Sequence, residues 1–314
     1  MHNQLTQKAL FAPSREISAM KAQEATLFAQ ITHEVNQLFN DDRDLLFLPA
    51  GRSLITTLSQ QRYNIEMGDD FTATDELETD SSIKLDYLMQ TFINRIDNAK
   101  PIFNQNFMDL IEGAIARGRG SVSERVIRSA EKIVNSILKG SYRYQNGTER
   151  IDFGNGQSTL INFASSGQQE VVWILLLILL LILNQRQVFL VIEEPEAHLF
   201  PVAQKQIIDL IALLANQSDN QVVLTTHSPY ILSSFNNLLY AHKLGAEKAE
   251  QISQVVDRPL WIDPKRLNAY MLEEGKARSI VDSEMGSIES AEIDKASDII
   301  VDIFNQLFEL EEEA

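Results

Sequence analysis

The spacing of apolar residues predicts helices in the first part of the chain. Apolar positions recur at helical intervals over residues 6–40, 83–103 and 122–138. A short apolar run, Leu45–Leu48, stops at a proline and glycine turn and predicts one buried strand. Residues 64–82 are polar and acidic, which predicts a solvated loop.

The second part of the chain alternates strands and helices. Val188–Ile192 and Val222–Thr226 are short apolar runs, typical of buried strands. Helical spacing follows each run, over Ala203–Leu214 and from Pro229. Continuous apolar strands separated by helices predict an α/β fold with a mostly parallel sheet covered on both faces.

Two further segments have distinct patterns. Tyr142–Ile161 has two apolar or aromatic runs around Asn146-Gly147, followed by a second turn at Gly154-Asn155-Gly156, which predicts a β-hairpin. Val171–Leu183 is an unbroken apolar run of thirteen residues. Because a membrane-spanning helix needs about 20 residues, we interpret this run as a buried core helix and expect no membrane partner.

Charge and composition exclude several classes of protein. The chain has 27 basic and 44 acidic residues, a net charge of −17, so it is not a general polyanion binder. It has no cysteine, which excludes disulfides and thiolate metal sites. The first twenty residues lack a signal-peptide pattern, and we expect a cytoplasmic protein.

Charge is unevenly distributed along the chain. Residues 117–150 carry eight basic and three acidic residues, a local balance of +5. Such residues form either a solvated helix face or a phosphate-binding surface, with Arg125, Arg128 and Lys132 as candidate DNA contacts. The last segment, 271–314, has thirteen acidic and three basic residues. Its helical apolar spacing predicts an acidic-faced helix packed on the core.

Polar residues follow both predicted parallel strands. Glu193 and Glu194 end the first strand, and His227 follows the second. Ligands bind at the carboxyl ends of strands in open α/β sheets, so these three residues form a candidate site. Two adjacent carboxylates leaving an apolar strand need a metal, a cation or solvent to compensate their charge. A lone histidine is more often structural, but the shared location favours function.

Ser165-Ser166-Gly167-Gln168 precedes the apolar helix. Backbone N–H groups at a helix start can bind an anion, and the helix dipole favours this. The alternative is a helix N-cap formed by one of the serines.

Together these segments resemble the ABC-type ATPases, in particular the SMC-like and OLD-like (overcoming lysogenization defect) branch of bacterial AAA ATPases. VFLVIEEPEAHLFP resembles a Walker B strand with its D-loop, ASSGQQE a variant signature motif, and TTHSPY the switch-histidine loop. LLFLPAGRS resembles the strand before the helical insertion of that branch. The resemblance covers about residues 45–240 and implies ATP and Mg²⁺ as cofactors.

The resemblance also implies roles for individual residues. Glu193 matches the acid that holds Mg²⁺, Glu194 the general base that polarises water, and His227 the sensor of the γ-phosphate. Ser165 and Gly167 match signature positions that touch ATP bound to an opposite subunit. Ser166 stands where the signature motif usually has its first glycine, and Gln168 is a further residue of that motif. Phosphoryl transfer needs metal, water positioning and charge neutralisation, which agrees with this set of residues.

A phosphate-binding P-loop, GxxxxGK[ST], does not occur in the sequence. Gly113–Ser121 has the glycine spacing but lacks the lysine, and Gly154–Thr159 lies in the predicted hairpin. We therefore expect a family member without its Walker A segment. The resemblance divides the chain into residues 1–55 (helices and strand of the ATPase head), 56–140 (a helical arm or lid) and 141–314 (the rest of the head).

Three functions agree with these features. The first is an ATP-driven switch in which two heads, identical or different, dimerise around ATP, in DNA-related or anti-phage processes and with any nuclease or effector as a separate subunit. The second is a non-enzymatic subunit that provides a signature face, a dimer surface or a DNA-binding arm. The third is a metal-dependent hydrolase using the acids and histidine directly, which leaves ASSGQQE unexplained.

Overall fold

The structure is a computed structural model. It describes residues 41, 43–52, 87–104, 107–117, 123–217, 219–289 and 295–312. Contacts divide the chain into two units, Met1–Asp44 and Leu45–Ala314. In the first unit, the hydrogen bond and ion pair that Arg43 forms with Asp41 (2.7 Å) lower the pKa of Asp41 to about 2. The helices predicted for residues 6–40 and the loop predicted for 64–82 lie outside the described residues.

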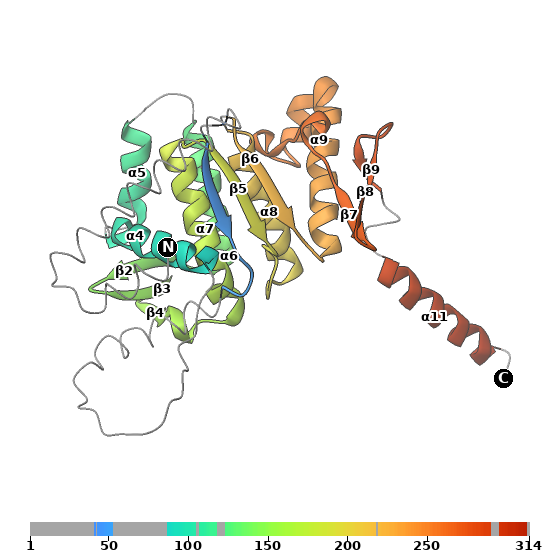
Figure 1. Ribbon diagram of the computed structural model, residues 1–314, viewed down its shortest axis with the longest axis horizontal. Coiled ribbons are helices and arrows are strands. Elements are labelled where there is room, and N and C mark those ends of the chain that lie inside the picture. Colours follow the sequence, from blue (N-terminus) through green and yellow to red (C-terminus); the bar gives the residue numbers. More distant parts are fainter. Residues whose placement is uncertain are drawn as a thin grey trace, which may run out of the picture. The chain divides into compact units, whose positions relative to one another are not determined.

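A three-stranded sheet with the order β1-β5-β6 forms the centre of the fold. It contains β1 (Asp44–Leu48), β5 (Val188–Glu193) and β6 (Gln221–Thr225). β5 and β6 are parallel and place Glu193 beside Thr225. The three arrows point the same way in Figure 1. The predicted strands and their parallel pairing are confirmed.

The two faces of this sheet differ in exposure. Leu190 and Ile192 of β5 are completely buried on one face. On the other face, Val223 of β6 is 47% exposed and, in β1, Leu45 is 62% exposed. The sequence predicts coverage on both faces, whereas the described residues leave one face partly open to solvent.

The apolar run forms the central helix α7 (Ser166–Asn184). This helix is long and apolar enough to span a membrane by length and composition, but two thirds of its apolar window is buried inside the protein. α7 packs against α6 (Glu124–Leu138) and α8 (Pro201–Ala215), and α8 packs against α9 (Pro229–Ser253). The prediction of a buried core helix is confirmed.

The helices before α7 belong to the same core. They are α4 (Tyr87–Ala99), the 3₁₀ helix η1 (Lys100–Asn104), α5 (Phe107–Arg117) and α6. Ile96, Ile111 and Val134 are completely buried in one cluster with the side chains of α7 and β5. The sequence predicts an arm over residues 56–140, but the described helices of that range pack on the head because their apolar stripes are buried there.

Between α6 and α7 lies an antiparallel sheet of three strands. They are β2 (Ser141–Gln145), β3 (Thr148–Gly154) and β4 (Gln157–Leu160), followed by the 3₁₀ helix η2 (Ile161–Phe163). Asn146 and Gly147 have φ values of 50° and 74°, which the β2–β3 turn requires. The predicted hairpin is confirmed and extended by a third strand.

A buried ion pair ties this sheet to the helices. Lys100 of η1 lies 3.0 Å from Glu149 of β3, which also accepts a hydrogen bond from the Tyr142 hydroxyl (2.9 Å). Burial opposes the charge of Lys100, but Glu149 and Asp97 raise its pKa above the ordinary value. Burial, together with the nearby Glu149, also raises the pKa of Tyr142. This network holds η1 and the antiparallel sheet together.

The C-terminal region continues from α9, which is kinked at Lys248. It contains the 3₁₀ helices η3 (Arg258–Leu260) and η4 (Pro264–Arg266), the hairpin of β7 (Tyr270–Glu273) and β8 (Lys276–Ser279), the pair β9 (Val281–Asp282) and β10 (Ser287–Ile288), and α11 (Lys295–Glu312). The prediction that the last helix packs on the core is wrong for α11, whose apolar side chains are exposed.

Replacing Glu149 by Ala tests the buried ion pair. We expect a loss of about 3 kcal/mol in the free energy of unfolding, because Lys100 then keeps its charge in a mostly buried position without its main partner. Urea denaturation measures the loss. Arg143 forms an exposed pair with Asp152 on the same sheet. Arg143→Gln is therefore the matched control and should cost less than about 1 kcal/mol. Equal losses in the two variants would contradict this role for the Lys100–Glu149 pair.

Candidate functional site

The structure brings together the predicted strand-end residues. Glu193 is the last residue of β5, and one of its carboxylate oxygens accepts a hydrogen bond from the backbone of Ala50 (3.0 Å). The carboxylate of Glu194 lies 3.9 Å from Nε2 of His227. The His227 side chain is 91% exposed and the Glu194 side chain 43%. A carboxylate and an imidazole therefore face solvent at neighbouring strand ends, where a reacting water or phosphate has access.

The backbone of Glu194 has an unusual conformation. Its φ is 42°, in the left-handed region that non-glycine residues rarely adopt. Its N–H donates to the carbonyl of Thr225 (3.0 Å), and its own carbonyl accepts from the N–H of Ala197. These bonds hold the turn after β5 against the end of β6. Such backbone strain persists where the surrounding structure fixes it, often at functional sites.

Arg52 is the buried centre of this region, and sequence reasoning missed it. Its side chain, only 2% exposed, donates to the carbonyls of Glu193 (2.7 Å), Glu194 (2.9 Å) and Glu170 (3.1 Å), and to that of Pro49. The backbone N–H of Arg52 also donates to the Glu170 carboxylate (3.0 Å). One guanidinium thus joins the turn after β1, the first turns of α7 and the end of β5.

Arg52 is also the cation that the clustered acids require. Burial lowers the pKa of Arg52, and the charges of Glu170, Glu194, Glu196 and Glu193 oppose that shift. The sequence prediction allowed a metal, a cation or solvent as compensation, and the structure supplies a cation. The signal was present in LLFLPAGRS, since an arginine directly after a buried strand and turn is available to acids at neighbouring strand ends.

Glu196 is a second functional candidate that sequence reasoning missed. It is 8% exposed, and its Oε1 accepts hydrogen bonds from the Thr226 hydroxyl (2.5 Å) and the His227 N–H (3.0 Å). Thr226 in turn accepts from the N–H of Ser228, the N-cap of α9. The other carboxylate oxygen of Glu196 is buried without a hydrogen-bond partner among the described residues. Glu196 therefore fixes the backbone that carries His227.

The predicted signature residues lie at the start of α7. Ser165 is the N-cap and forms a capping box with Gln168, whose side chain also donates to the carbonyl of Leu138 (2.7 Å). The N-cap alternative is therefore confirmed for Ser165. Ser165 and Ser166 are exposed, whereas Gly167 is buried, and a Cβ there would lie 2.7 Å from the carbonyl oxygen of His198. The contact of these residues with ATP stays a prediction.

Two of the three candidate DNA contacts are engaged within the protein. Arg125 forms an ion pair with Asp257. Arg128 pairs with the carboxylates of three surrounding residues, Glu112, Glu124 and Glu131. Lys132 is exposed. Most of this charge is therefore compensated on the protein's own surface, and DNA contact through α6 stays a prediction that these ion pairs do not favour.

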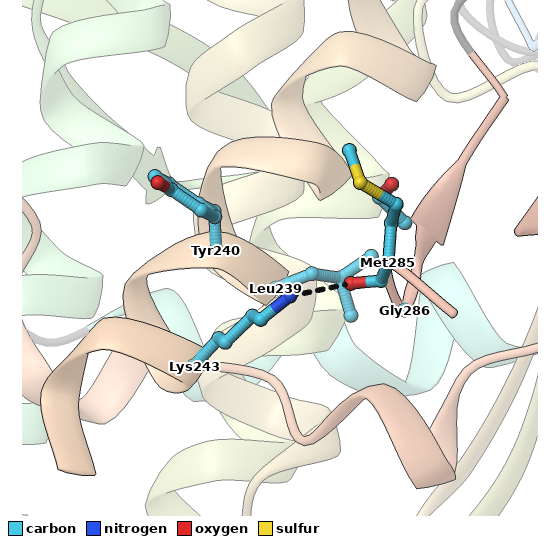
Figure 2. A pocket seen from close by; sticks show the side chains of 6 residues that line it. Leu239, Tyr240, Lys243, Met285 and Gly286 are labelled. Carbon is cyan, nitrogen blue, oxygen red and sulfur yellow. Dashed lines mark hydrogen bonds between the residues drawn. The ribbon is translucent and has the colours of Figure 1, made fainter. Parts of the chain in front are cut away.

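Two hollows of the described residues lie away from the strand ends. The pocket in Figure 2 lies between α9 and the turn at Met285, where Lys243 donates to the Met285 carbonyl (3.3 Å). Its volume of about 50 Å³ is too small for a nucleotide. A second hollow on the antiparallel sheet includes Arg143 and Arg150, and neither is lined by the strand-end residues. No group of three or more histidine and acidic residues there could hold a metal ion.

Comparison with known proteins places the chain in a family of ATPases. The AAA ATPase domain family matches residues 3–232, which is more than half of the chain. No curated protein matches this chain. One solved structure that resembles this chain comes from work on the structural biochemistry of ATP-driven dimerization and DNA-stimulated activation of SMC ATPases. It is 14% identical, covers 57% of this chain and 93% of that chain, and has a TM-score of 0.33.

The class of protein follows from these observations. A parallel sheet flanked by helices, together with the match to the AAA ATPase domain family, fits a P-loop NTPase-like fold. The chain belongs to the AAA ATPase domain family.

Arg52→Lys tests the central role of the guanidinium. We expect the free energy of unfolding to fall by about 3 kcal/mol, because an ammonium group cannot reach all the carbonyls that Arg52 joins. Urea denaturation measures the change. Arg150→Lys is the matched control, since Arg150 is exposed and its guanidinium donates one long hydrogen bond, of 3.4 Å, to the Ser158 hydroxyl. A lysine variant at position 52 as stable as the control would refute the assignment.

Proposed function

We propose that this chain provides the hydrolytic edge of an ATP-driven switch of the ABC and SMC type. The observation that carries the proposal is the placement of Glu194 and His227 at adjacent parallel strand ends, 3.9 Å apart and both open to solvent. In this proposal Glu194 polarises the attacking water and His227 contacts the γ-phosphate. Arg52 and Glu196 hold the two turns that carry these residues.

The residues present fit a Mg²⁺ ion in part. Mg²⁺ prefers oxygen ligands and is usually held by one or two carboxylates together with phosphates and water. Glu193 offers a carboxylate at the strand end, with one oxygen held by the Ala50 N–H. Bound Mg²⁺ would neutralise charge on the phosphates during transfer. The role of Glu193 is to present that carboxylate in a fixed orientation.

The phosphate-binding part of the site is not in the printed sequence, which has no GxxxxGK[ST] string. Within the described residues, β6 is an edge strand of the sheet, and His227 follows its carboxyl end. Val223 on its partly open face is 47% exposed. An added strand and helix bearing a phosphate loop would cover both the edge and the face. We therefore place the docking of such a segment at β6.

Head-to-head association is supported by apolar side chains beside the predicted signature residues. Phe163, Phe200 and Val202 are 75%, 85% and 72% exposed. The chain segments are adjacent, because Gly167 packs directly on the carbonyl of His198. Exposed aromatic residues of this kind are typical anchors of protein interfaces. In this proposal they surround ATP held by the opposite head, as Ser165 and Ser166 face solvent there.

A non-enzymatic subunit is the second candidate. It is favoured by the missing phosphate loop, and it uses the same apolar surface for association without hydrolysis. A role with DNA or in anti-phage defence, with a nuclease or effector as a separate subunit, stays a proposal beside either candidate. The ion pairs of Arg125 and Arg128 on α6 lend no support to DNA contact there. The third hypothesis, a metal-dependent hydrolase, receives no support from the described residues, which contain no metal-binding cluster.

The ATPase proposal predicts a dependence on a second component. The chain alone should release phosphate from ATP no faster than buffer, because it lacks the phosphate loop. With a separate polypeptide added that carries the missing strand, phosphate loop and helix, Glu194→Gln should slow turnover by about a hundredfold or more, the usual contribution of a general base. Steady-state phosphate release measures both. Turnover that is insensitive to Glu194→Gln would favour the non-enzymatic subunit, and fast turnover by the chain alone would contradict the missing-loop argument.

The association surface predicts an ATP-dependent complex. Mixed with a P-loop-bearing head, the chain should form a heterodimer when ATP is present, seen as an increase in mass by light scattering. Phe200→Asp should abolish the increase, since a carboxylate would be buried at the interface. Tyr240→Asp is the matched control, because Tyr240 is also exposed but lies on α9. A complex that survives Phe200→Asp would exclude this surface.

A further inference from the structure

The C-terminal helix α11 (Lys295–Glu312) exposes a wide apolar face. Eight large apolar side chains on it are each at least half exposed. They are Ile299, Ile300, Val301, Ile303, Phe304, Leu307, Phe308 and Leu310. Eight such side chains present roughly 800 Å² of apolar surface, more than the few hundred Å² typical of the largest patch on a monomer. This area is close to what one partner buries in a stable interface.

The spacing within this face is regular. Ile300, Ile303, Leu307 and Leu310 are separated by three, four and three residues. Intervals of three and four residues keep one seam facing a partner helix, as in coiled coils and helical bundles. Ile299 and Phe304 flank the seam and widen it. A face of this width fits another apolar helix better than a flat, polar surface.

Before its last turn, where Glu311 lies beside the seam, the acids of α11 lie on its other side. At 100° per residue, Asp298, Asp302 and Glu309 fall on the arc opposite the seam. Two identical helices can therefore pack seam to seam without placing these carboxylates against one another. An anionic partner such as nucleic acid or an acidic lipid surface would be repelled by this arc and by a chain of net charge −17.

We propose that α11 is a self-association helix that packs against α11 of a second copy of this chain. This contact is separate from the proposed ATP-dependent surface at Phe200 and needs no nucleotide. Because burial of apolar surface drives it and the net charge opposes it, association should strengthen as salt rises.

Sedimentation velocity of the full chain without nucleotide tests the proposal. We expect a concentration-dependent dimer or small oligomer at micromolar protein. The double substitution Ile303→Asp and Leu307→Asp should weaken it by about a hundredfold or more, since carboxylates would enter an apolar seam. Asp302→Asn with Glu309→Gln is the matched control on the polar arc and should leave association intact or strengthen it. Phe200→Asp should also leave it intact, which separates this contact from the proposed function.

The absence of native cysteines allows a second measurement. Leu307→Cys should form a disulfide-linked dimer under mild oxidation, whereas Asp302→Cys, on the polar arc, should not. A monomeric wild-type chain would overturn the proposal. If the wild-type chain is a monomer and the double aspartate substitution lowers its thermal stability, the apolar face of α11 packs on the chain's own head instead. Self-association unaffected by the double substitution would overturn the proposal as well.

Discussion

The buried guanidinium of Arg52 is the contact on which the proposed site depends. It satisfies carbonyl groups at the ends of two strands and in the first turns of α7, and it lies among four glutamates. Acids so close together at the edge of an apolar sheet would otherwise repel one another and favour solvent. With the cation in place, the strand-end turns are fixed, and Glu194 can keep a left-handed backbone at φ 42°.

Much of the fold was predictable because local patterns determine it. The apolar runs that become β5 and β6 are short and β-branched, and the turns between β2, β3 and β4 contain asparagine and glycine. The carboxyl-end rule was enough to bring Glu194 and His227 together. The strands and turns needed only residues close to one another in sequence, and the pairing of Glu194 with His227 needed only that their two strands are parallel neighbours.

The contacts that sequence reasoning missed are long-range. Arg52 reaches the carbonyl of Glu193, which is 141 residues away. The local sequence LLFLPAGRS indicates an arginine near the strand ends but not which carbonyls it binds. The partner of Arg125 is Asp257, 132 residues away, so a cation expected to meet DNA neutralises an acid of its own chain. The exposure of α11 was also unpredictable, since an amphipathic pattern shows that a face will be covered but not by which surface.

The hydrogen bonds around Glu196 have a mechanical consequence. They run from the turn after β5 through Thr226 to Ser228. The Ser228 hydroxyl donates to the side chain of Gln204 on α8 and also caps the first turn of α9. The backbone of His227 is inside this path, so it cannot shift without displacing the first turn of α9 or breaking a buried bond. A displacement of the His227 backbone would therefore shift the first turn of α9, which continues as one helix up to its kink at Lys248.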